Sequence, residues 1–369
     1  MTSSIYKQNT MSIKLEDIAK ETGFSISTVS RVLSNSDYPV SEPIREKVLR
    51  VAETLGYEPN IAARSLRTDR TNTIGIIVDD LLSPFTPPIV RGIQDTLNEN
   101  GFLSLIVNSD WDPDQEQAAI KTLLSRPVDG IIFVEYSHQT ISDVLERSNK
   151  PRVFVHRLFG SPIKNSVVPD DYYGASLATE HLISLGHRRI GYINGPENWH
   201  TCRARLRGYQ DTLARHNLPF EASLVQPGDW EIESGYAAAK NLLNLPEQPT
   251  AIFAANDPMA LGAIYAIQDA GRSVPDDVAV VGYDNRNFAK TVRPRITTVS
   301  MPVIEMGGVA AELLLKQIAE GRKEEEEIKV KGQLIIRETC GASEASRTQQ
   351  EPDARTLFRR VLFNKQPED

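Results

Sequence analysis

The sequence predicts a small all-α domain of the helix-turn-helix type, followed by a larger α/β domain of two lobes, each built on a doubly wound parallel sheet. Residues 12–59 hold three short amphipathic helical patterns, the first two separated by a glycine turn. From residue 73, short apolar runs alternate with helical patterns, which is typical of parallel sheets covered by helices. A chain of 369 residues is too long for one ordinary core, and residues 73–341 suffice for two lobes.

The helix-turn-helix pattern begins with a helix expected over residues 15–22, where apolar side chains recur on one helical face. Gly23 suits the left-handed residue that ends a helix. Ser25 suits the cap of a second helix over residues 26–33. A third helix follows Ser41, which is its expected cap.

The second helix carries an unusual outward face, made of Ile26, Ser27, Ser30 and Arg31. This set fits the major groove of DNA, where arginine reads guanine and short side chains meet thymine methyl groups or phosphates. The alternative is a plain helical hairpin. A solvated helix face ordinarily carries Glu, Asp or Lys, and this helix has none of them.

The segment "NIAARSLRTDRTNT", residues 60–73, is too short to form a stable helix alone and too rich in alanine for a plain linker. A segment that folds only against DNA has this composition. Leu66 is its large apolar side chain near the end, and such a residue can wedge into a base step from the minor groove. We therefore expect residues 60–72 to be a hinge helix and linker.

The larger domain shows its strand–helix alternation along most of its length. Buried parallel strands are expected at residues 73–80, 102–107, 129–134, 152–156, 189–195, 251–257 and 278–284. Helices are expected at residues 88–101, 114–126, 172–187, 204–217, 231–244 and 257–271. Residues 293–321 come after the strands of the second lobe, so the chain is expected to cross back between lobes there.

Ligands of parallel sheets bind in the loops that follow the carboxyl ends of the strands. These loops combine aromatic rings, carboxylates, an amide and arginines, a set that suits a sugar. Trp199 and Trp230 also fit a core role, Trp230 being the better candidate for ligand contact. Asp257 fits a cap of the helix that follows it.

The motifs occur together in one order. "TVSRVLSNS", "AARSL" and "TIGIIVDD" are followed by "DGIIF", "LATEHLISLGHRRIGYINGP", "AIFAANDPMALGAI", "VAVVGYDN" and "ITTVSMP". The chain thereby resembles the LacI/GalR family of bacterial repressors from about Lys14 to Cys340. The resemblance implies a two-lobed sensor like the type I periplasmic binding proteins. It also implies a homodimer on a pseudo-palindromic, double-stranded operator, controlled by a small-molecule effector.

The resemblance assigns DNA-contacting roles by position. Ile26 and Ser27 match the variable specificity positions, Arg31 the base-contacting arginine and Leu66 the intercalating leucine. The positions that match phosphate contacts are Thr28, Ser30, Asn35 and Tyr57, and Ala63 and Arg64 belong to the hinge segment that meets DNA. Lys14 departs from the family pattern, which usually has a capping Thr there. Loss of that cap costs roughly 1 kcal/mol, and a lysine at this position can contact a phosphate instead.

The resemblance also places the effector. The matching positions are Phe85, Asp170, Thr201, Arg205, Trp230, Asn256 and Asp284. Relatives often have Asp–Arg where this chain has His156–Arg157, and Arg157 with Arg205 could hold a sugar acid or phosphate. His156 and Arg157 equally fit a buried ion pair or a rim charge. The family is divided among effectors, so a sugar or its acid or phosphate is favoured, while a purine stays possible.

Composition bounds the remaining classes of function. The net charge of −8 requires any DNA-binding charges to be gathered on one face. The first ten residues lack the features of a secretory signal, no apolar run is long enough to span a membrane, and Cys202 and Cys340 lack metal-ligand spacing. We therefore expect a cytoplasmic protein with no cofactor and no membrane contact.

Two other classes of protein use a two-lobed fold of this kind. An enzyme would need a nucleophile, phosphate-binding or metal motif in the sheet loops, and none is present. A solute receptor for transport would need export and would not carry residues 12–70. Residues 1–11 are expected to be an extension, the run 321–330 a solvated loop, and residues 342–369 a flexible tail without the three heptads of a tetramerising helix.

Overall fold

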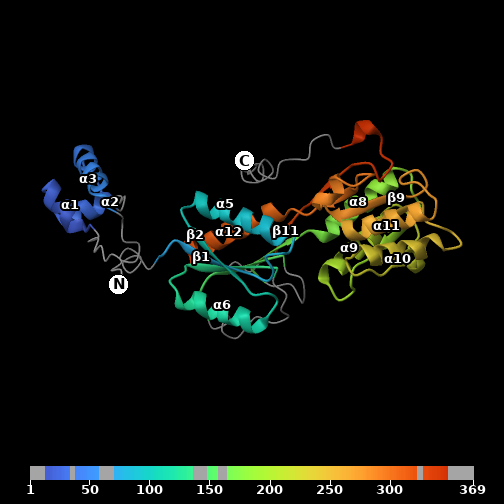
Figure 1. Ribbon diagram of the computed structural model, residues 1–369, viewed down its shortest axis with the longest axis horizontal. Coiled ribbons are helices and arrows are strands. Elements are labelled where there is room, and N and C mark those ends of the chain that lie inside the picture. The colour runs from blue at the N-terminus through green and yellow to red at the C-terminus, as the bar shows by residue number, and fades with distance from the viewer. Residues whose placement is uncertain are drawn as a thin grey trace, which may run out of the picture. The chain divides into compact units, whose positions relative to one another are not determined.

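The computed structural model describes residues 13–33, 38–57, 70–135, 148–156, 164–321 and 327–347 (Figure 1). The chain divides into two compact units, residues 1–71 and 72–369. Residues 60–69 of the expected hinge and linker and most of the expected tail lie outside the described residues. Five expected site residues also lie outside them: Asn35, Ala63, Arg64, Leu66 and Arg157.

The first unit contains the three expected helices, α1 (Leu15–Thr22), α2 (Ile26–Leu33) and α3 (Glu42–Leu55). Gly23 has φ 75°, as expected for the left-handed turn, and Ser25 Oγ accepts a hydrogen bond of 3.1 Å from the N–H of Thr28. The small core holds Ile18, Val29, Val32, Val48 and Ala52. The predicted helix-turn-helix fold is thus confirmed.

Two cap predictions in this unit need correction. Ser41 precedes α3, but its side chain makes no cap hydrogen bond, and Pro in the first turn removes one of the N–H donors that needs a partner. At the start of α1, the Lys14 N–H donates to Asp17 Oδ2 at 2.8 Å. This hydrogen bond to the third residue of the helix thus offsets part of the missing Thr cap.

The first lobe of the second unit is a six-stranded parallel sheet with the order β11-β5-β4-β3-β1-β2. Its strands are β1 (Thr73–Val78), β2 (Leu103–Asn108), β3 (Gly130–Val134), β4 (Arg152–Val155), β5 (Ser166–Pro169) and β11 (Glu327–Val330). The helices α5 (Thr86–Glu99) and α12 (Val303–Glu320) cover one face, and α6 (Pro113–Ser125) covers the other (Figure 1). The predicted doubly wound architecture is confirmed for this lobe.

The second lobe is a six-stranded sheet with the order β12-β10-β9-β8-β6-β7, parallel except for β12. Its strands are β6 (Ile190–Ile193), β7 (Val225–Gln226), β8 (Ala251–Ala254), β9 (Ala279–Asp284), β10 (Thr297–Ser300) and β12 (Gln333–Ile335). The helix α8 (Asp171–Ser184) packs on α9 (His200–Arg215), and α10 (Ile232–Leu243) packs on α11 (Asp257–Asp269). Short 3₁₀ helices lie at Ala222–Leu224, Asn287–Lys290 and Glu344–Ser346.

The chain passes between the lobes after β5, after β10 and between β11 and β12. The expected return of residues 293–321 is confirmed, because α12 packs on α5 in the first lobe. The prediction of a solvated loop over the charge run 321–330 was wrong for its last four residues, which form β11 beside β5. Ile328 and Val330 pack on the core there, so apolar burial outweighs the charge of the preceding run.

Among the described residues, no helix is both long and apolar enough to cross a membrane.

Candidate functional site

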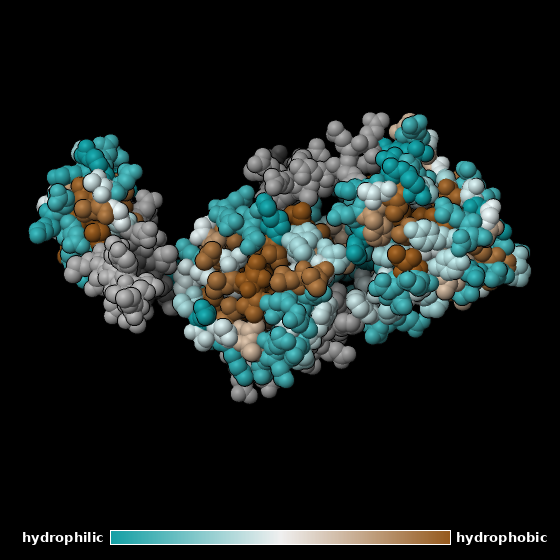
Figure 2. All heavy atoms as spheres, viewed as in Figure 1, coloured by the Kyte–Doolittle hydropathy of each residue, from teal (hydrophilic) through white to brown (hydrophobic). Residues whose placement is uncertain are grey.

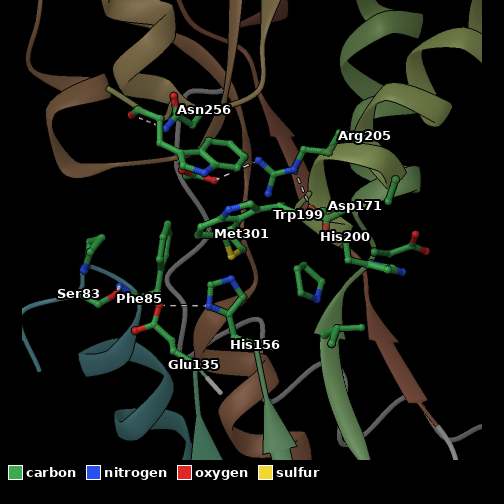
Figure 3. Close-up of a pocket in the computed structure, with 18 of the residues that line it drawn as sticks. Ser83, Phe85, Glu135, His156, Asp171, Trp199, His200, Arg205, Asn256 and Met301 are labelled. Carbon is green, nitrogen blue, oxygen red and sulfur yellow. Dashed lines mark hydrogen bonds and ion pairs between the residues drawn. The ribbon is translucent and has the colours of Figure 1, made fainter. Parts of the chain in front are cut away.

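A cavity of about 470 Å³ lies between the two lobes of the second unit. Its walls come from loops at the carboxyl ends of parallel strands in both sheets: Phe85 after β1, Glu135 after β3, His156 after β4 and Asp284 at the end of β9. The ends of parallel strands are where open α/β sheets bind ligands. Figure 3 shows the side chains of both lobes converging on this space.

Arg205 is the most heavily engaged side chain of the cavity. Its Nε donates to Asp171 Oδ1 at 2.8 Å, its Nη1 donates to the carbonyl of Ala255, and its guanidinium carbon lies 3.6 Å from the centroid of the Tyr283 ring. Burial alone would lower the pKa of Arg205, but the charges of Asp171 and Asp284 raise it. Arg205 is therefore a permanent cation, and Asp171, the Ala255 carbonyl and the Tyr283 ring fix its position.

Asp284 stands at the end of β9 with φ 99°, a left-handed conformation that a residue with a side chain rarely adopts. Its Oδ1 lies 3.7 Å from Arg205 Nη1. Burial raises the pKa of Asp284 to about 6, against the lowering effect of the positive charges of Arg205 and Arg286. The carboxylate is thus ionised at neutral pH and protonated in mild acid.

Asp257 is fully buried, and it binds the backbone of the loop that follows Asp284. Asp257 Oδ2 accepts a hydrogen bond of 2.7 Å from the N–H of Arg286, whereas its Oδ1 has no hydrogen-bond partner. Burial and the nearby charge of Asp284 raise the pKa of Asp257 to about 8. At neutral pH this carboxyl is therefore mainly in its neutral form.

The first lobe contributes a wall built on Glu135 and His156, which follow neighbouring strands. His156 Nδ1 lies 3.4 Å from Glu135 Oε1, and the Phe85 ring meets the His156 ring edge-on with centroids 5.2 Å apart (Figure 3). Burial raises the pKa of Glu135, but the adjacent His156 and a hydrogen bond from Thr86 hold it below its ordinary value. This wall therefore presents a carboxylate beside an imidazole.

Aromatic rings line the cavity from both lobes. The centroids of the Trp199 and Trp230 rings lie 5.5 Å apart at 63°, and the Arg286 guanidinium lies 5.6 Å from the centroid of the Phe85 ring. The Trp230 Nε1 is buried without a hydrogen-bond partner in the structure. A buried N–H of this kind is costly unless a ligand or water accepts from it.

The expected effector residues within the described part of the chain all line the cavity: Phe85, Asp170, Thr201, Arg205, Trp230, Asn256 and Asp284. Two of them also cap helices. Asp170 accepts from the N–H of Tyr173 at the start of α8, and Asn256 Oδ1 accepts from the N–H of Met259 at the start of α11. The expectation that Asp257 caps α11 was wrong, because the cap lies one residue earlier.

Sequence reasoning missed seven charged residues of the cavity: Asp80, Glu135, Asp171, Glu231, Arg286, Glu327 and Lys329. Asp171 directly follows Asp170 and Arg286 lies two residues after Asp284, so both stand beside residues that the sequence did single out. The cavity as a whole is acidic. Its described lining includes seven carboxylates against three permanently basic side chains, Arg205, Arg286 and Lys329.

The first unit presents the exposed face of α2. Ile26 is 48% exposed, Ser27 is exposed, and Thr28 and Ser30 are half-buried. The guanidinium carbon of Arg31 lies 4.1 Å from the centroid of the Tyr38 ring. Tyr57 is half-buried and packs against the small core. This face combines hydrogen-bonding side chains, one exposed apolar side chain and one cation.

Comparisons with known proteins match both parts of the chain. Residues 14–60 match the family of bacterial regulatory proteins of the lacI type, and residues 179–340 match the periplasmic binding protein-like domain. Catabolite control protein A of Priestia megaterium is 35% identical over 309 residues, which are 83% of this chain and 92% of that protein.

Two solved structures are similar over almost the same span. A complex of the transcriptional regulator CelR with cellobiose is 33% identical, with a TM-score of 0.65, and covers 89% of this chain and 99% of its own. A lac repressor dimer bound to operator and the anti-inducer ONPF is 30% identical, with a TM-score of 0.72, and covers 90% of this chain and 100% of its own.

Proposed function

Because the chain belongs to the LacI/GalR family of DNA-binding transcriptional regulators, we propose that it binds a pseudo-palindromic operator as a homodimer and that a neutral sugar in the cavity between the lobes controls this binding. Like its relatives, the protein is a transcriptional regulator and not an enzyme. The acidic, aromatic-lined cavity is the observation that carries the choice of effector.

The operator is read by the exposed face of α2. Ile26 and Ser27 begin this helix and are exposed, and its sequence contains no carboxylate that would repel DNA. Ser25 Oγ lies 2.8 Å from both Ser27 Oγ and Thr28 Oγ1, so the hydroxyl groups at the start of the helix are already ordered. Ordered side chains lose less entropy when they bind. Arg31 supplies the long hydrogen-bonding group that suits guanine.

The effector is neutral because the cavity repels anions. Seven carboxylates face three permanent cations, and Arg205 is already engaged with Asp171, Asp284 and the carbonyl of Ala255. A sugar acid or phosphate would have to compete with two aspartates for that arginine. A neutral sugar instead donates hydroxyl hydrogens to carboxylates and stacks its apolar face on an aromatic ring. Cellobiose in the similar CelR structure is a neutral sugar.

Binding of a ligand that contacts both walls favours one arrangement of the lobes over the other. Glu135 and His156 belong to the first lobe, whereas Arg205 and Asp284 belong to the second. A ligand shifts such an equilibrium only by its difference in affinity for the two arrangements. The chain crosses between the lobes three times. A change in the separation of the lobes therefore moves strands and helices of both lobes together.

The dimer is supported by an apolar surface on the first lobe. Figure 2 shows apolar side chains gathered on the near face of this lobe, between α5 and α6. Among the described residues of the lobe, the large exposed apolar side chains are Leu81, Leu82, Leu103, Ile106 and Trp111, of which Trp111 also lines the cavity. Surfaces of this kind mark sites of protein association. The lac repressor structure similar to this chain is a dimer on its operator.

The operator proposal is tested by selecting binding sites from random duplexes with the full-length protein. We expect a symmetric site, and we expect Arg31→Ala to weaken binding to it by about 1–3 kcal/mol per half-site contact. Arg215→Ala in the second lobe makes the same change of charge and is the control. Recovery of no symmetric site, or equal affinity of wild type and Arg31→Ala, contradicts the proposal.

The effector proposal is tested by calorimetry of the full-length protein with neutral mono- and disaccharides, the matching sugar phosphates and sugar acids, and purines. We expect a neutral sugar to bind and its phosphate to bind far more weakly. Tighter binding of a phosphate, an acid or a purine contradicts the assignment.

A further inference from the structure

The exposed Arg31 of α2 is stacked on Tyr38, a residue from the loop that precedes α3. The guanidinium carbon lies 4.1 Å from the centroid of the phenol ring. We propose that Tyr38 is a positioning residue for DNA reading, and that it holds the Arg31 guanidinium in the orientation that meets a guanine edge. This inference rests on the proposed reading of the operator by α2.

The stacking geometry is compatible with base reading. An aromatic ring attracts a cation through the negative face of its π system, so it contacts the flat side of the guanidinium. The N–H groups of arginine lie in the plane of the guanidinium and form the fork that pairs with O6 and N7 of guanine. Stacking therefore fixes the plane of the fork without using the donors that recognition requires.

The energetic reason for such a device is the length of the arginine side chain. An unrestrained arginine loses roughly 2 kcal/mol of rotamer entropy when it is fixed. Arg31 is exposed and lies near the end of α2, so the core does not hold its far end. A ring that orders the guanidinium before binding lowers this cost.

Tyr38 is a poor candidate for a core residue. It is 56% exposed, and it is not among the side chains that form or flank the core of the first unit. Val40, two residues further on, is the side chain of this loop that packs against the core. Truncation of Tyr38 is therefore expected to leave the three helices folded.

The size of the effect follows from the strength of an exposed cation–π contact. Loss of the ring should lower operator affinity by roughly two- to fivefold per half-site, or roughly four- to twenty-five-fold for a site with two halves. The loss should fall on the operator and not on unrelated duplexes, because phosphate contacts are unchanged.

The test is a double-mutant cycle on full-length protein, with Arg31→Ala, Tyr38→Ala and the double variant. Binding is measured to the selected operator and to duplexes altered at the base pair that Arg31→Ala no longer distinguishes. If Tyr38 acts through Arg31, Tyr38→Ala loses discrimination at that same base pair, and the double variant is no weaker than Arg31→Ala. Tyr38→Phe keeps the ring and should restore discrimination.

The remaining outcomes separate this inference from the proposed function. If Arg31→Ala loses discrimination and Tyr38→Ala does not, the positioning role is wrong while reading by α2 stands. If Tyr38→Ala weakens all duplexes equally and adds to Arg31→Ala, Tyr38 contacts DNA itself and the inference is also wrong. If Arg31→Ala changes nothing, the proposed reading fails and the inference with it. Tyr38→Leu keeps apolar bulk without a ring face, and it replaces Tyr38→Ala if that variant unfolds.

Discussion

Arg205 and Asp171 form a buried ion pair that joins α9 to α8 in the second lobe. The Nε of the arginine lies 2.8 Å from Oδ1 of the aspartate, and the two side chains are 3% and 8% exposed. Asp171 is the first residue of α8, which starts directly after the chain leaves the first lobe at Pro169. The pair therefore fixes the place where one crossing enters the second lobe.

Arg205→Met is expected to destabilise the protein strongly. The change leaves Asp171 and Asp284 buried without their main neutralising charge, and breaking a buried pair in this way costs about 3–5 kcal/mol. The free energy of unfolding is measured by urea denaturation of the full-length protein. Arg207→Met is the matched control, because Arg207 lies on the same helix, is 76% exposed and should change stability by less than about 0.5 kcal/mol. Similar unfolding curves for both variants contradict the role of the pair.

Asp257→Asn is expected to gain stability relative to the wild type as pH rises from 5 to 7. The pKa of Asp257 in the folded protein is about 8, above the value of 3.8 for an ordinary aspartate. Between these values the unfolded carboxyl is ionised and the folded one is protonated, so raising the pH favours unfolding of the wild type. One such proton changes the free energy of unfolding by about 1.4 kcal/mol per pH unit.

This pH dependence is measured by urea denaturation of both proteins at several pH values. Asparagine keeps the oxygen that accepts from the N–H of Arg286 and cannot ionise. The difference between the two proteins should therefore grow with pH. A constant difference would mean that Asp257 is already ionised in the folded protein at pH 5.

Effector binding is expected to weaken in mild acid because of Asp284. Its pKa of about 6 means that the carboxylate, which accepts hydrogen bonds from hydroxyl groups, is lost as pH falls below 6. Affinity should then fall up to about tenfold per pH unit. The positive charges of Arg205 and Arg286 lower the pKa of Asp284 and so oppose the effect of its burial.

Calorimetry with the identified sugar between pH 5 and pH 8 checks this dependence. Asp284→Asn removes the titrating group at nearly constant shape, so it should bind weakly at every pH with a much flatter profile. An unchanged slope in this variant would assign the pH dependence to another group.

Much of the fold follows from local pattern, whereas the site depends on pairing between distant residues. Apolar runs such as residues 129–134 predict strands because burial on both faces excludes polar side chains. The strands β5, β7, β10, β11 and β12 were missed, because each has at most four residues and little apolar signal, whereas the predicted strands of the same length are mostly apolar. Strands this short are stabilised by their neighbours in the sheet.

The Glu135–His156 wall shows why site residues escape sequence reasoning. The two residues are far apart in the chain. They meet because β3 pairs with β4, and Glu135 and His156 are the residues that directly follow these two strands. His156 attracted notice as a departure from a family pattern, but nothing local to Glu135 marks it. Likewise, Asn256 and Asp257 both suit a helix cap in sequence, and only the backbone conformation selects Asn256.

The apolar surface of the first lobe gives a test of dimerisation that is independent of DNA. Leu103 and Ile106 lie on β2, the edge strand of the sheet, and are 62% and 40% exposed. A charged side chain in the centre of an interface is costly to bury, so Ile106→Lys should shift the protein toward monomer in sedimentation experiments at micromolar concentration. Leu185→Lys in the second lobe, at a residue 36% exposed, is the matched control. Operator affinity should fall with the loss of dimer, because each monomer then holds one half-site. A dimer that survives Ile106→Lys and Leu103→Lys unchanged would place the interface elsewhere.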